Sequence, residues 1–129
     1  MEIYGELIEY TDIFLAILAA IEAIIDFDPN TLNHKSKGKW VTVYIELPER
    51  YDVCDTDVGS IYLNNFISAA LSPSEIDDID KDGVEDLMVK FEREDVLYLL
   101  NQGENVEVII SGNLYDGTHF EGRDSIKVI

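Results

Sequence analysis

The chain has 129 residues, 47% of them hydrophobic and 28% charged, with a formal net charge of −18. This size and balance fit one globular domain with an appendage, long enough to bury a core. The acidity argues against binding a nucleic-acid backbone, which needs a basic surface, and favours cation binding. The single cysteine, Cys54, excludes an intramolecular disulfide. Its acidic neighbours raise the pKa of a thiol, so we expect an inert side chain.

The first 25 residues carry a heptad-like pattern of apolar side chains. Its positions are Ile3, Leu7, Tyr10, Phe14, Ile17, Ile21 and Ile24. The pattern predicts a helical N-terminal segment at residues 1–23, followed by a domain at residues 24–129. An additional strand region and a divergent membrane-targeting segment are the alternatives. The apolar run at residues 13–25 is shorter than a membrane span of roughly 20 residues. No basic residue precedes it, so the segment is not a recognisable signal peptide.

Short segments with alternating apolar side chains predict strands after residue 24. The clearest begins at Trp40, with Val41, Val43, Ile45 and Leu47 toward the core and the residues between them outward. Pro48 ends it. Further strands are expected at residues 25–29, 60–63, 66–70, 87–92, 105–112 and 125–129. Tight turns are expected at residues 64–65 and 116–118, because Asn and Asp-Gly favour hairpin turns.

Residues 93–101 interrupt this alternation. Their apolar side chains fit about two helical turns: Val96, Leu97, Leu99 and Leu100. Gly103 stands where a helix C-terminal cap is expected. Short strands at intervals of roughly ten residues are typical of a β-sandwich. We therefore predict a mostly β protein, an immunoglobulin-like antiparallel β-sandwich with an N-terminal helix and one short helix that crosses between the sheets.

The strongest functional signal is a run of carboxylates at residues 78–86. They occupy positions 1, 3, 5 and 9 of the run, and Gly83 at position 6 permits a sharp turn. A hard cation such as Ca²⁺ takes six to eight oxygens from such a curled loop. The predicted ligands are Asp78, Asp80, Asp82, Asp86 and the backbone carbonyl of Val84. The alternative is an acidic, solvated turn that binds no metal.

The loop lacks one part of the EF-hand pattern. That pattern has a bidentate Glu at position 12, where this chain has Val89. Residues 87–92 alternate as a strand, so we expect position 12 to lie in the core. The remaining ligands come from water or from Glu75, Asp77 or Glu85. No pair of helices flanks the loop, so the site is expected to hold a turn in place and not to act as a switch.

Three runs resemble a calcium-associated immunoglobulin-like module of bacterial and archaeal secreted or cell-surface proteins. They are residues 28–33 with 37–41, residues 78–86 with 87–91, and residues 116–122. The loop at residues 78–86 is also similar to those of dockerins, thrombospondin type 3 repeats and integrin-type propeller blades. The resemblance implies a structural or adhesive module, extracellular or at the cell surface, with no enzymatic activity. Its partner, a protein or a glycan, is not implied.

The sequence therefore favours a non-catalytic calcium-binding module whose fold the ion stabilises. A metal-free interaction module that forms homo-oligomers through residues 3–24 is the first alternative. A carbohydrate-binding module is the second, with an aromatic platform of Trp40, Tyr44, Tyr62, Tyr98 and Tyr115, although strand packing explains these side chains equally well. The two histidines, His34 and His119, are expected to be surface residues and not a shared zinc site.

Overall fold

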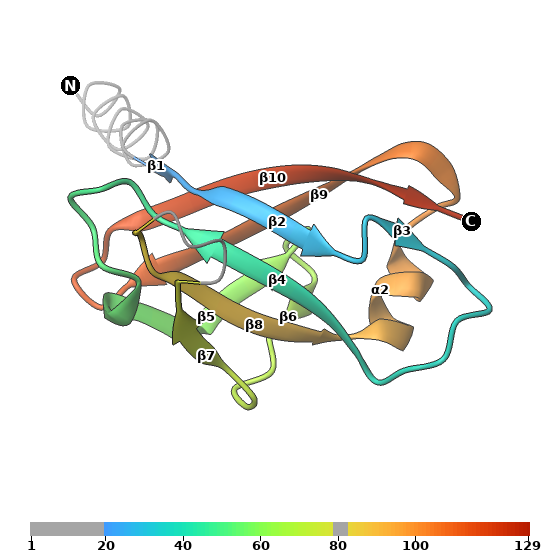
Figure 1. Ribbon diagram of the computed structural model, residues 1–129, viewed down its shortest axis with the longest axis horizontal. Coiled ribbons are helices and arrows are strands. Elements are labelled where there is room, and N and C mark those ends of the chain that lie inside the picture. Colours follow the sequence, from blue (N-terminus) through green and yellow to red (C-terminus); the bar gives the residue numbers. More distant parts are fainter. Residues whose placement is uncertain (1–19, 79–82) are drawn as a thin grey trace, which may run out of the picture.

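The computed structural model describes residues 20–78 and 83–129, which form a mostly β structure of two sheets (Figure 1). The six-stranded sheet has the order β1 (Ile21–Glu22), β10 (His119–Val128), β9 (Gly103–Leu114), β5 (Thr56–Leu63), β6 (Ile67–Ser68), and β3 (Thr31–Leu32) also pairs with β10. The four-stranded sheet has the order β2 (Ile24–Asp28), β4 (Trp40–Glu46), β8 (Asp86–Glu92), β7 (Glu75–Asp77). The pairs are antiparallel, except that β1 and β3 run parallel to β10.

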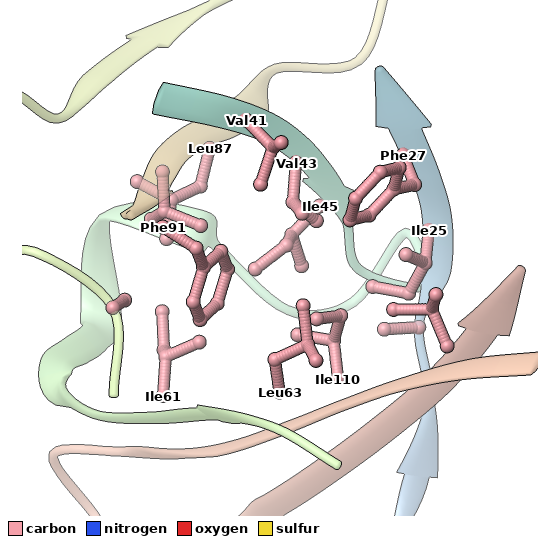
Figure 2. Close-up of a cluster of buried hydrophobic side chains, with 14 of the residues drawn as sticks. Ile25, Phe27, Val41, Val43, Ile45, Ile61, Leu63, Leu87, Phe91 and Ile110 are labelled. Atoms are coloured by element: carbon pink, nitrogen blue, oxygen red, sulfur yellow. The ribbon is translucent and has the colours of Figure 1, made fainter. Parts of the chain in front are cut away.

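Side chains from both sheets meet in one hydrophobic core (Figure 2). The largest fully buried ones include Phe27, Phe91, Phe120, Ile45 and Ile110. The inward face predicted for β4 is confirmed, because Val41, Val43, Ile45 and Leu47 are all buried, but Thr42, which was expected to face outward, is buried as well. Successive side chains of a strand point to opposite faces, so this pattern turns one face of β4 inward and its other face to the outside.

The first described residues pass from one sheet to the other. Strand β1 pairs with the start of β10, β2 pairs with β4 in the opposite sheet, and β3 returns to the end of β10. The predicted N-terminal helix falls mostly at residues 1–19, outside the described residues. Within residues 20–23 the prediction is wrong, because Ile21 lies on strand β1, and Ile24, the last position of the heptad pattern, lies on strand β2. Both are β-branched, and pairing with a neighbouring strand overrides their helical spacing.

The predicted crossover helix is present. Helix α2 (Arg93–Leu99) follows β8 of one sheet and leads into β9 of the other. The expected cap at Gly103 is wrong. The helix ends at Leu99, where the N–H of Leu100 donates to the carbonyl of Val96 at 2.9 Å. Gly103 instead begins β9 and pairs with Val128 of β10.

Both predicted hairpin turns are confirmed. Asn64 and Asn65 have positive φ values of 49° and 61° between β5 and β6, and Gly117 has a φ of 92° between β9 and β10. Strands β3 and β7 were not predicted, since they have two and three residues and too little sequence to show an alternation. Strand β5 begins at Thr56, four residues before the strand expected at residues 60–63, and follows a turn of 3-10 helix at Val53–Asp55.

One end of the molecule gathers several chain segments. Strands β2 and β8 begin there, β4 ends there, and the turn between β9 and β10 lies there, at the left in Figure 1. Helix α2 and the C-terminus lie at the other end. Within the described ranges, no helix is both long and apolar enough to cross a membrane.

Candidate metal site

The acidic loop at residues 78–86 connects two antiparallel strands. Strand β7 ends at Asp77 and β8 begins at Asp86, and these two residues are register partners. The loop is therefore closed at its base by a strand pair. Because its first residue, Asp78, follows Asp77 directly, positions 1 and 9 of the motif are held close together at the base of the loop, which we call its neck. A convergent set of ligands requires this closure.

Asp78 also bends the loop toward its own glycine. Its Oδ2 accepts a hydrogen bond of 2.9 Å from the backbone N–H of Gly83. Gly83 has a φ of 90°, which a residue with a Cβ adopts only at a cost, and an added Cβ would meet nothing within 4 Å. The glycine is thus required for its backbone conformation and not for space. Positions 1 and 6 of the motif are in contact, as a tightly curled loop demands.

The other predicted ligands divide into two groups. Asp80 and Asp82 lie outside the described residues. Val84 is 37% exposed, and Asp86 is buried with 5% of its surface exposed. Position 12, Val89, is fully buried in the core between the sheets. The expectation that this position packs in the core, where an EF-hand has a ligand, is therefore confirmed.

The three acidic residues named as further ligands take different positions. Glu75 and Asp77 lie on the edge strand β7, where Oδ1 of Asp77 accepts a hydrogen bond of 2.8 Å from the N–H of Asp78. Glu85 reaches a different group, because its Oε2 lies 3.9 Å from Sγ of Cys54. Asp77 is thus adjacent to the neck of the loop, while Glu85 faces the segment that precedes β5.

Glu85, Asp52 and Cys54 form a second cluster of possible ligands. One ligand atom from each lies within 4.8 Å of the others, and all three residues are exposed. A hydrogen bond to Asp52 is the main reason that the pKa of the Cys54 thiol is raised, and the charges of Asp52 and Glu85 add to it. A raised thiol pKa disfavours the thiolate, the form that binds metals and attacks electrophiles. The cluster therefore agrees with an inert cysteine.

Glu46 is a carboxylate near the loop that sequence reasoning did not place there. It is the last residue of β4 and lines a cleft of about 620 Å³ together with Gly83, Val84 and Glu85. Its Oε1 is inaccessible to solvent. Alternation along β4 indicated an outward side chain at this position. Which strand lies next to β4, and in which register, was not readable from the local sequence.

The remaining candidate groups are dispersed. Nδ1 of His34 lies 3.1 Å from the carbonyl oxygen of Ile129, and Nδ1 of His119 lies 2.8 Å from Oδ1 of Asn113. These two histidines lie at opposite ends of β10, which disfavours a shared zinc site. The five aromatic residues considered as a platform are spread over four different elements: Trp40 and Tyr44 on β4, Tyr62 on β5, Tyr98 on α2, and Tyr115 in the β9–β10 turn.

Comparisons with protein-family models, curated proteins and solved structures find no significant match. The carboxylates at the loop and the backbone carbonyl of Val84 are oxygen ligands, whereas the cluster that includes Glu85 also contains the sulfur of Cys54. Oxygen donors suit Ca²⁺ and Mg²⁺, whereas zinc and copper sites use nitrogen and sulfur. The described carboxylates of the loop, taken by themselves, are ligands that suit a hard divalent cation.

Proposed function

We propose that the protein is a non-catalytic calcium-binding module, structural or adhesive in role, whose β-sandwich is stabilised by one Ca²⁺ in the loop at residues 78–86. The ligands of the proposed site are Asp78, Asp80, Asp82, Asp86 and the carbonyl of Val84. The observation that carries the proposal is the closed neck of the loop. The Asp77–Asp86 strand pair and the Asp78–Gly83 hydrogen bond support a convergence of carboxylates.

The effect of the ion on stability follows from linkage. A ligand that binds only the folded state stabilises it by about 2.7 kcal/mol when its free concentration is a hundred times Kd. The cation also relieves repulsion between carboxylates that the loop holds together. Strand β7 has only three residues and lies at the edge of the four-stranded sheet, where it pairs with β8. Ca²⁺ is expected to secure this edge of the four-stranded sheet.

We further infer that the sandwich is of the immunoglobulin-like type. The four-stranded order β2-β4-β8-β7 corresponds to strands A, B, E and D of that fold. The order β10-β9-β5 corresponds to G, F and C, and β6 is an additional strand next to C. The sheet assignments and the strand order support this topology. With the acidic loop, they agree with the resemblance to calcium-associated modules of secreted or cell-surface proteins.

Thermal unfolding in the presence of EDTA or of millimolar Ca²⁺ tests the proposal. We expect a higher melting temperature with Ca²⁺ and a smaller effect with Mg²⁺, which prefers octahedral sites that retain water. Asp80→Ala is expected to abolish the response to Ca²⁺. Glu104→Ala is the matched control, because Glu104 is an exposed acidic residue on β9 and its ion pair with Lys127 is at the surface. Identical melting curves in EDTA and Ca²⁺ for the wild type would refute the proposal.

A further inference from the structure

A hollow of about 410 Å³ lies between the edge of the six-stranded sheet and helix α2. Its lining comes from β6 with the turn before it and from the helix: Phe66, Ile67, Ser68, Asp95, Tyr98 and Leu99. The three helix residues follow the spacing i, i+3 and i+4, which places them on one face of a helix. That face of α2 and the last strand of the sheet therefore share one site.

Two aromatic side chains of this hollow are open to solvent. Tyr98 is 94% exposed and Phe66 is 77% exposed, more than any other large hydrophobic side chain among the described residues. Ile67 and Leu99 are half-buried and pack against the core, so they supply a fixed apolar base. Aromatic side chains are enriched in protein interfaces and often contribute much of the binding energy. The hollow thus offers two rings for a partner to cover.

Asp95 gives the hollow a negative charge. Within the described ranges, its carboxylate has no hydrogen-bonding or ion-pair partner. Arg93, two residues earlier, is already engaged, since Nη1 donates to Oγ of Ser36 at 3.1 Å and Nη2 donates to the carbonyl of Trp40 at 3.0 Å. Aromatic ring faces also attract positive charge. A carboxylate beside two exposed rings is therefore complementary to a cationic group.

Strand β6 adds backbone groups to the same hollow. It is the last strand of the six-stranded sheet. The N–H of Ala69 donates to the carbonyl of Ile61 on β5 at 3.0 Å, and such bonds involve every second residue of an antiparallel strand. The N–H and C=O of Ser68 therefore point away from β5, toward the open edge. Open strand edges pair with extended segments of other chains.

We infer that this hollow binds an extended basic segment of a partner protein, with an Arg side chain against Phe66 and Tyr98 and paired with Asp95. A guanidinium group is planar, stacks on aromatic rings and binds a carboxylate through two hydrogen bonds, so it matches all three. The net charge of −18 attracts a basic partner and repels a second copy of this chain. The first 19 residues contain no Lys or Arg and so do not supply the cation. The inference concerns the partner of the module and is independent of its calcium site.

Asp95 has one alternative role. It lies in the first turn of α2, where a negative charge stabilises the N-terminus of a helix. Glu94 lies in the same turn but does not line the hollow. If Asp95 serves only the helix, Asp95→Asn and Glu94→Gln have equal effects on peptide binding. If Asp95 binds the partner, only Asp95→Asn weakens binding. Glu94→Gln is therefore the matched control.

An NMR titration of the ¹⁵N-labelled full chain with the peptide acetyl-Thr-Val-Arg-Val-Thr-amide tests the inference. We expect shifts at residues 66–68 and 95–99. Citrulline in place of the peptide's Arg keeps the shape without the charge, and we expect it to raise Kd about fivefold or more. Asp95→Asn and Tyr98→Ala should each raise Kd by a similar factor. Tyr115→Ala controls for Tyr98→Ala, since Tyr115 is 74% exposed on the β9–β10 turn.

Each other outcome overturns the inference. No shift at these residues with about 5 mM peptide shows that the hollow does not bind it. Equal binding of the Arg and citrulline peptides, or equal losses in Asp95→Asn and Glu94→Gln, excludes the ion pair. Equal shifts with methylguanidinium alone indicate a site for a small cation. A dimer of the wild type that Tyr98→Ala abolishes, by sedimentation without peptide, indicates a second copy as the occupant. Backbone spectra establish that each variant is folded, as the exposure of Asp95 and Tyr98 leads us to expect.

Discussion

The backbone N–H of Phe27 donates a hydrogen bond of 2.9 Å to Oδ2 of Asp124. Phe27 lies on β2 in the four-stranded sheet, and Asp124 lies on β10 in the six-stranded sheet. The Asp124 side chain of the six-stranded sheet therefore accepts a hydrogen bond from the backbone of β2, which is the edge strand of the four-stranded sheet. Edge strands carry backbone groups that no neighbouring strand can pair, and such groups invite association with other chains. This contact closes one edge of the sandwich within the molecule.

We expect Asp124→Ala to lower the free energy of unfolding by about 1–3 kcal/mol, because it leaves a part-buried N–H without its acceptor. Asp124→Asn retains an acceptor oxygen and is expected to lose much less. Urea unfolding of both variants measures the difference. Equal losses would show that the charge of Asp124, and not the hydrogen bond, determines the effect.

Asp26 is expected to make the protein less stable as the pH rises. Partial desolvation is the main cause of a raised pKa of its carboxyl group, even though the residue is mostly exposed, and the charges of Asp124 and Asp28 raise the pKa further. The folded state thus holds this proton more tightly than the unfolded chain, whose pKa is near 3.8. The contribution of Asp26 to the free energy of unfolding is therefore fully present below pH 3.8. It is lost as the pH rises through the raised pKa of the folded state.

Asp26→Asn removes this dependence and is expected to stabilise the protein at pH 7 by less than about 1 kcal/mol, since the side chain is largely exposed and its charge is screened. Unfolding measured between pH 4 and pH 7 checks the sign. A variant that is less stable than the wild type at pH 7 and equally stable at pH 4 would contradict the argument.

Gly122 permits the close approach of β10 to the segment between β1 and β2. A Cβ added at Gly122 would collide with the backbone carbonyl oxygen of Ala23. Backbone atoms move less readily than side chains, so we expect Gly122→Ala to cost about 1–3 kcal/mol of stability. Gly59→Ala is the control, because its Cβ would lie at ordinary contact distances of 3.4 and 3.6 Å. A similar loss in both variants, by thermal unfolding, would indicate a general effect of removing glycine.

Cys54 is expected to react slowly with alkylating agents despite its exposure. The hydrogen bond to Asp52 is the main cause of its raised thiol pKa, and the thiolate is the reactive form. Asp52→Asn should therefore speed alkylation by iodoacetamide at pH 8. Asp57→Asn is a control of equal charge change, since Asp57 is absent from the causes of the shift. An unchanged rate for Asp52→Asn would show that Asp52 does not govern the thiol.

The parts of the fold that were predicted correctly are those whose signal is local. Val41, Val43 and Ile45 identify β4 because alternation follows directly from the pleat of a strand. Asn64-Asn65 and Asp116-Gly117 mark the two hairpin turns because these residues accept the backbone angles that the turns require. Helix α2 was predicted because residues 93–101 interrupt the alternation of apolar and polar side chains that marks the strands. In each case the information lies within fewer than ten residues.

The errors occurred where a distant segment decided the outcome. Ile21 and Ile24 fit a heptad, but strands β10 and β4 lie beside them and pair with their backbone. Gly103 stands where a helix cap is expected, but it pairs with Val128 of β10 and is therefore the first residue of β9. Propensity amounts to fractions of a kcal/mol per residue, so the formation of several strand hydrogen bonds outweighs it.

The sequence by itself determined the acidic character, the mostly β composition and the spacing of carboxylates at residues 78–86, since each is a property of neighbouring residues. The tertiary structure alone decided that β7 and β8 close the base of that loop, that the first strands pass between the sheets, and that Glu46 stands next to Asp86. The reason is strand register. Glu46 and Asp86 are separated by 40 positions in the chain, and only the pairing of β4 with β8 makes them neighbours.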